Sequence, residues 1–81
     1  YFNAGNAFYK ENNYKQAVKS YKRATFHSKE LRAKNYANMG NAYARLGKQD
    51  DLQQAIKSYE NSLKIQEDKE IRENLQNVKK V

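Results

Sequence analysis

The chain has 81 residues, a net charge of +7, and hydrophobic residues at 38% of its positions. A chain of this length forms one small domain, and without cysteine it has no disulfide or thiolate chemistry. It contains no proline and no apolar run as long as a membrane span, so the composition favours a small all-α fold.

The first two helices are expected at residues 1–11 and 14–28. Asn12 follows the first of them, in the position where asparagine replaces glycine in a left-handed helix cap. Asn13 followed by Gln16 has the spacing of a capping box, which predicts the start of the second helix.

Three further helices are expected at 30–46, 51–66 and 69–80. Gly47 closes the first of them, Asp51 with Gln54 reads as a capping box for the second, and Asp68 is the expected cap of the third. Compared with the first pair of helices, residues 48–50 are then an insertion before the second of these helices. No strand is expected.

These helices contain two near-copies of one sequence motif. The two copies are 35 residues apart in the first half of the motif and 38 residues apart in its second half. A glycine inside a helix costs about 1 kcal/mol relative to alanine, so each glycine predicts close approach of the paired helix. The copies are Tyr1-x2-Ala4-Gly5-x2-Phe8 with Ala17-x3-Tyr21-x2-Ala24, and Tyr36-x2-Met39-Gly40-x2-Tyr43 with Ala55-x3-Tyr59-x2-Ser62.

This motif and its period resemble the tetratricopeptide-repeat (TPR) family. The resemblance implies a single domain over 1–81, built as a right-handed solenoid fragment of antiparallel helix-turn-helix repeats. Two TPR-like hairpins are expected at about 1–29 and 30–66, and a capping helix at about 68–80. Because Tyr1 stands inside the first expected helix, we expect the chain to be a piece of a longer protein.

The resemblance also implies a non-catalytic module that binds a peptide or partner protein in a concave groove, lined by the first helix of each repeat. Asparagine side chains suit this role because each can donate to and accept from a peptide backbone. The bland alternative is that these are ordinary exposed polar positions, since asparagine occurs ten times in the chain. The candidate peptide-binding residues are Phe2, Asn6, Tyr9, Lys10, Lys34, Asn38, Asn41 and Arg45.

Members of the family that hold a C-terminal carboxylate use a lysine one turn before an asparagine in the first helix, and an asparagine in the second. Asn6 and Asn38 match the two asparagine positions, whereas Phe2 stands in the lysine position. The resemblance to such a carboxylate clamp is therefore partial, and Phe2 predicts an apolar anchor instead.

A narrower resemblance links the phrases Gly5-Asn6-Ala7-Phe8-Tyr9 and Gly40-Asn41-Ala42-Tyr43, with Arg72-Glu73-Asn74-Leu75-Gln76, to the short repeat domains of bacterial aerotolerance-operon membrane proteins. It implies assembly at the cell envelope. The sequence itself leaves open whether the protein is cytoplasmic or envelope-associated.

No arrangement of residues typical of a catalytic, cofactor or metal site is present, so we expect no enzyme activity and no cofactor. His27 is expected in the last turn of its helix, where the dipole favours a cation. Asp50 and Asp51 are interpreted as helix-capping residues rather than metal ligands.

Lys15, Lys19 and Lys22 fall at i, i+4 and i+7, and with Arg23 they predict an outward basic stripe on the second helix. A solvated face is the preferred interpretation. The alternative is binding of nucleic acid or another anionic surface, with a membrane reached only through other parts of the parent chain. A third possibility is a structural segment of a longer solenoid or a homo-oligomer.

Overall fold

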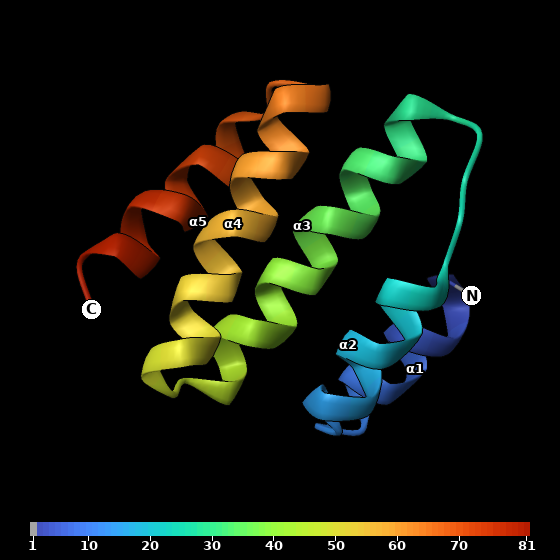
Figure 1. The fold of residues 1–81 in the computed structure, drawn as a ribbon, viewed down its shortest axis with the longest axis horizontal. Helices are drawn as coiled ribbons and strands as arrows, with labels where there is room; N and C mark the ends of the chain where they lie inside the picture. Colours follow the sequence, from blue (N-terminus) through green and yellow to red (C-terminus); the bar gives the residue numbers. More distant parts are fainter. Residues whose placement is uncertain (1) are drawn as a thin grey trace.

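The computed structural model describes residues 2–81, except for the side chains of Phe2 and Asn3. The described residues form helices joined by short connections and no strand, which confirms the all-α prediction. The helices pair as antiparallel hairpins in a layered arrangement of 30 × 26 × 17 Å (Figure 1). They are α1 (Phe2–Lys10), α2 (Tyr14–Arg23), α3 (Lys29–Leu46), α4 (Gln49–Ile65) and α5 (Lys69–Lys79).

The order of packing follows the order of the chain. α1 pairs with α2, and α3 pairs with α4 through the largest helix–helix interface. α3 also packs against α2, and α5 packs against α4, so each hairpin is covered by the element that follows it. This stacking is that of a TPR-like solenoid fragment.

The two mid-helix glycines lie where a tyrosine ring from the paired helix presses against the backbone. A Cβ atom on Gly40 would fall 2.7 Å from Cε1 of Tyr59, and one on Gly5 would overlap the ring of Tyr21. Both distances are far below van der Waals contact, so any side chain would push the helices apart. The predicted close approach is confirmed in both hairpins.

The second helices supply the centre of the core, where the repeated motif is buried except at the half-buried Ala24. Ala17 and Ala55 are fully buried, and Tyr21 and Tyr59 are nearly so. Ser62, a polar member of the motif, is satisfied because its hydroxyl donates to the carbonyl of Ala33 at 2.7 Å.

The helix ends predicted from Asn12, Asn13, Gly47 and Asp68 are confirmed. Asn12 and Gly47 have φ of 63° and 77°, the left-handed geometry of a helix C-terminus. The Asn13 side chain accepts the backbone N–H of Gln16 at 3.4 Å, and Asp68 accepts that of Ile71 at 3.1 Å.

The prediction that the second helix runs to residue 28 is wrong, because α2 ends at Arg23. Ala24 turns to an extended conformation, and the buried side-chain amide of Asn35 donates to the carbonyl of Tyr21 at 2.9 Å. This contact with α3 replaces the next helical turn. His27 therefore lies exposed in the linker, and its predicted place in a last helical turn is also wrong.

The expected capping box of Asp51 and Gln54 is wrong as well. α4 begins at Gln49 after Lys48, which makes no side-chain cap, and Asp50 and Asp51 lie in the first turn. Carboxylates at these positions interact favourably with the positive end of the helix dipole, without a specific capping hydrogen bond. Most of the expected insertion is thus an extra piece of helix.

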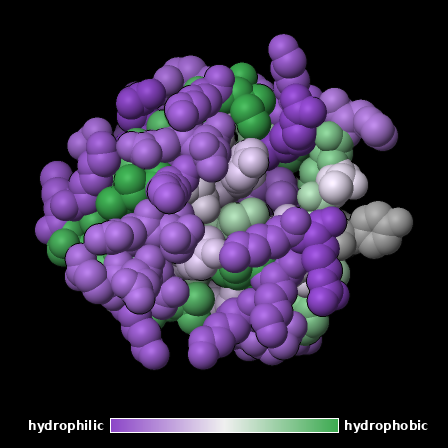
Figure 2. Space-filling view, in the orientation of Figure 1, coloured by the Kyte–Doolittle hydropathy of each residue, from purple (hydrophilic) through white to green (hydrophobic). Residues whose placement is uncertain are grey.

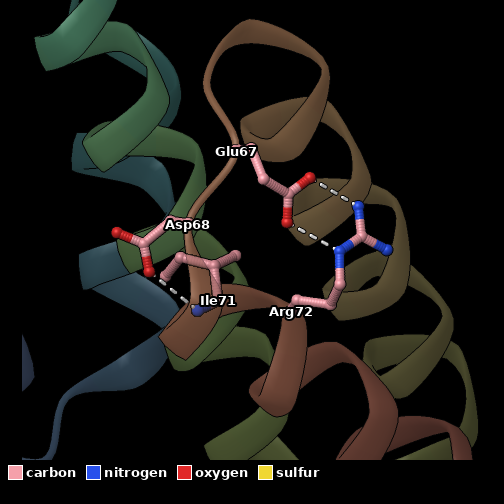
Figure 3. Close-up of polar contacts among 4 residues, drawn as sticks. All are labelled: Glu67, Asp68, Ile71 and Arg72. Atoms are coloured by element: carbon pink, nitrogen blue, oxygen red, sulfur yellow. Dashed lines mark hydrogen bonds and ion pairs between the residues drawn. The ribbon is translucent and has the colours of Figure 1, made fainter.

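Glu67 and Arg72 fix the turn into α5. Nε and Nη2 of Arg72 donate to the Glu67 carboxylate at 2.7 and 2.8 Å, a bidentate pair drawn in Figure 3. The hydrogen bonds from Arg72 lower the pKa of the Glu67 carboxyl. Because both side chains are exposed, this pair orients the turn more than it stabilises the fold.

Candidate interaction groove

Two asparagine–tyrosine pairs occupy equivalent places in the two hairpins. The hydroxyl of Tyr21 on α2 donates to Oδ1 of Asn6 on α1 at 2.7 Å. The hydroxyl of Tyr59 on α4 donates to Oδ1 of Asn41 on α3 at 2.6 Å. Each asparagine directly follows the glycine under the tyrosine ring, so one tyrosine both packs on the helix and orients its amide.

The tyrosines of both pairs have raised pKa values. Burial is the main cause that raises the pKa of Tyr21 and of Tyr59 from 10.0 to about 12, and the Tyr9 phenol adds to both shifts. The two tyrosines therefore stay protonated donors throughout the physiological range. The two polar pairs lie in neighbouring hairpins, and the helices that carry their asparagines, α1 and α3, contact each other.

The predicted residues of α1 share one open hollow. Asn6, Tyr9 and Lys10 line it together with Ala7, and its volume is about 420 Å³. Asn6 and Tyr9 are half-buried, whereas Lys10 is exposed at the last residue of the helix. The structure thus brings Asn6, Tyr9 and Lys10 together, whereas the side chain of Phe2 lies outside the described residues.

Tyr14 is a neighbour of this surface that the sequence analysis did not single out. Its ring meets that of Tyr9 edge to face, with centroids 5.2 Å apart, and its hydroxyl donates to Oδ1 of Asn12 at 2.8 Å. The guanidinium of Arg45 lies 5.4 Å from the centroid of the Tyr14 ring, a cation–π contact. Arg45 is therefore drawn to the first hairpin by an aromatic residue.

The remaining candidates on α3 are separated from one another. Asn38 is half-buried and makes no side-chain hydrogen bond within the described residues. Lys34 lies about 16 Å from Arg45 along the helix, at 1.5 Å per residue. Its ammonium is 3.7 Å from Glu30, so a carboxylate stands beside the α3 part of the groove, which the choice of candidates had overlooked.

Charge is divided unevenly between the two parts of the chain. Residues 1–47 hold nine lysines and arginines against two glutamates, whereas residues 48–81 hold seven cations against seven carboxylates. The predicted basic stripe is exposed on α2, with the ammonium of Lys22 5.9 Å from the centroid of the Tyr43 ring. The face on which α2 lies in front of α1 is largely hydrophilic in Figure 2.

Comparison with known proteins supports the reading of the repeat. Two family models described as tetratricopeptide repeat match residues 1–25 and 36–73. The chain belongs to the tetratricopeptide-repeat family. A search of curated proteins gives no match to it.

The TPR matches coincide with the structural repeat. Each matched segment contains one of the glycine-tyrosine-asparagine contacts described above. TPR repeats generally mediate protein–protein interactions and are typically non-catalytic. Within the described residues no group of three or more His, Cys, Asp or Glu side chains could hold a metal ion, and no helix is long and apolar enough to cross a membrane.

Proposed function

We propose that this TPR domain is a non-catalytic interaction module that binds an extended peptide or partner segment along the inner face of α1 and α3. The observation that carries the proposal is the repeated pairing of Asn6 with Tyr21 and of Asn41 with Tyr59. Each tyrosine occupies the amide oxygen, so the amide nitrogen of each asparagine is the group left to serve a partner.

This arrangement favours binding because the amides are oriented before a partner arrives. A side chain already fixed by a hydrogen bond loses little rotamer freedom on association. Tyr9 adds an aromatic side chain to the hollow that Asn6 lines, and Lys10 and Arg45 stand at equivalent positions of the two repeats. A small surface of this kind supports affinities in the micromolar range, about −8 kcal/mol.

The test must remove the donors without unfolding the domain. Alanine at Asn6 or Asn41 would leave a buried tyrosine hydroxyl without its acceptor, which costs about 1–3 kcal/mol. Asn6→Asp and Asn41→Asp keep the acceptor and remove the N–H donors, and Asn38→Ala removes an amide that makes no internal bond in the described chain. Captured proteins from source-cell extract should be lost with this triple variant.

A variant of the outer face serves as the matched control. Lys15→Gln, Lys19→Gln and Lys22→Gln change three exposed residues of α2 and leave the inner face intact. A partner retained by this control and lost by the asparagine variant supports the groove. Equal capture by the wild type and the asparagine variant would contradict it.

The charge of residues 1–47 supports a second candidate, binding of nucleic acid or another anionic surface through the α2 stripe. In that case the capture falls with the lysine variant and with added salt, because phosphate contacts release counterions. Insensitivity to both would exclude it.

The narrower proposal of assembly at a bacterial cell envelope rests on the sequence phrases alone. Neither family model is specific to aerotolerance-operon proteins. Fractionation of the full-length protein from its source cells is the direct test, and recovery only in the soluble fraction would contradict envelope assembly.

A further inference from the structure

A small notch opens where α3, the end of α4 and the start of α5 meet. Its volume is about 90 Å³, roughly three water molecules at ~30 Å³ each. Its apolar wall consists of Ala33, Ala37 and Ile71, of which the two alanines are buried in α3. A small space with this lining suits an aliphatic chain.

The mouth of the notch carries hydrogen-bond acceptors from two sides. Glu30 lies on α3, and Gln66 and Asp68 lie on the connection between α4 and α5. Asp68 uses one carboxylate oxygen to cap α5. In Figure 3 its carboxylate points toward the side of α3, whereas Glu67 turns to the opposite side, where Arg72 binds it.

Lys34 is the cation at this mouth, and its partner is already Glu30. The two charged groups are 3.7 Å apart and more than half exposed, so their pairing is weak and exchangeable. With two carboxylates against one ammonium, the residues that line the notch carry a net negative charge. The notch therefore complements a cation with an aliphatic stem.

We propose that this notch receives a lysine side chain of the bound partner segment. The four-carbon stem of lysine contacts the alanine and isoleucine wall, and its compact ammonium reaches Glu30 and Asp68. Lysine suits the notch better than arginine, because its ammonium is compact whereas the guanidinium of arginine is broad and planar. This inference rests on the proposed function, since Lys34 lines the notch and is also one of the predicted groove residues.

The test uses n-butylammonium chloride, which reproduces the lysine side chain, and n-butanol as its uncharged counterpart. Methyl signals of Ala33, Ala37 and Ile71 are followed by NMR on the whole 81-residue domain at matched ionic strength. Butylammonium should shift these signals with about fivefold higher affinity than butanol, because two weak ion pairs add to the apolar contact.

Glu30→Gln with Asp68→Asn removes both carboxylates while asparagine preserves the cap of α5. Glu60→Gln with Glu73→Gln removes the same charge elsewhere and is the matched control. The notch variant should lose the advantage of butylammonium, and the control should keep it. Equal shifts by butanol, or equal losses in both variants, would overturn the proposal.

Failure of this experiment leaves the groove untouched, because no partner takes part in it. Failure of the capture experiment with the asparagine variant likewise leaves the notch result standing. The two outcomes therefore separate the lysine site from the wider proposed function.

Discussion

The first hairpin pairs helices of 9 and 10 residues, whereas the second pairs helices of 18 and 17 residues. Both nevertheless contain the same contact, in which a tyrosine ring covers a glycine and its hydroxyl holds the next asparagine. The contact therefore depends on local register and not on helix length. The additional turns of the second hairpin supply further packing, such as the bond from Ser62 to Ala33.

A second contrast lies in the burial of Ala4 on α1, Met39 on α3 and Leu75 on α5. Met39 and Leu75 are buried, because α3 and α5 each pack on a preceding hairpin. Ala4 is exposed on α1. The outer side of α1 is thus less supported than the helices that follow, and the second hairpin should contribute more to stability.

The largest expected effect comes from filling the space under the tyrosine rings. Gly40→Val should lower the free energy of unfolding by about 3 kcal/mol, the upper range for overpacking a core. Gly5→Val should cost less, because short α1 can shift away from α2 more easily. Denaturant unfolding of both variants measures the difference between the hairpins.

Ala7→Val is the control for placing a branched residue in a helix. Ala7 is exposed on α1, so this change should cost only the helix propensity difference, about 0.5 kcal/mol. A cost for Gly40→Val no larger than this would mean that the tyrosine ring does not require glycine.

A middle effect is expected from the tyrosine hydroxyls. Tyr59→Phe and Tyr21→Phe should each lower the free energy of unfolding by about 1 kcal/mol, the net value of one hydrogen bond. A double-mutant cycle of Tyr59→Phe with Asn41→Ala isolates the pair. Tyr36→Phe is the control, because its hydroxyl has no hydrogen bond within the described residues, and a coupling near zero would contradict the assigned bond.

The smallest effect is expected where the connection into α5 is held by an exposed pair. Glu67→Gln should lower the melting temperature slightly at neutral pH and low salt, and Glu73→Gln should leave it unchanged. Because Arg72 lowers the pKa of Glu67 in the folded state, its contribution is present above the unfolded pKa. The contribution is lost as the pH falls through the folded pKa, so the two variants should then melt alike. A difference that persists in acid would contradict this origin.

Much of the fold follows from short-range chemistry that the sequence displays. Asn12 and Gly47 tolerate left-handed geometry, and Asn13 and Asp68 carry side chains that cap helices, so these ends could be predicted locally. The repeated glycine also predicts a close contact between helices, because glycine is otherwise unfavourable inside a helix.

The sequence indicated where the candidate site lies, but it did not indicate which hydrogen bonds the asparagine side chains make. Asn6 and Asn41 were chosen as surface amides, but each also holds a tyrosine from the paired helix. The residue types allow either role, and only the packing of α2 on α1 and of α4 on α3 brings the phenol within reach. The full list of peptide-binding residues stays a prediction, as do the domain boundaries.

The sequence by itself determined the repeat, the helical class and the helix ends fixed by local caps, because backbone and neighbouring side chains decide these over a few residues. Tertiary structure decided where α2 stops, since the carbonyl of Tyr21 is taken by Asn35, fourteen positions along the chain. It also decided that the end of α4 and the start of α5 meet α3 beside Ala33 and Ala37, which forms the notch. Contacts between residues distant in sequence depend on how the hairpins stack, and no local pattern records that geometry.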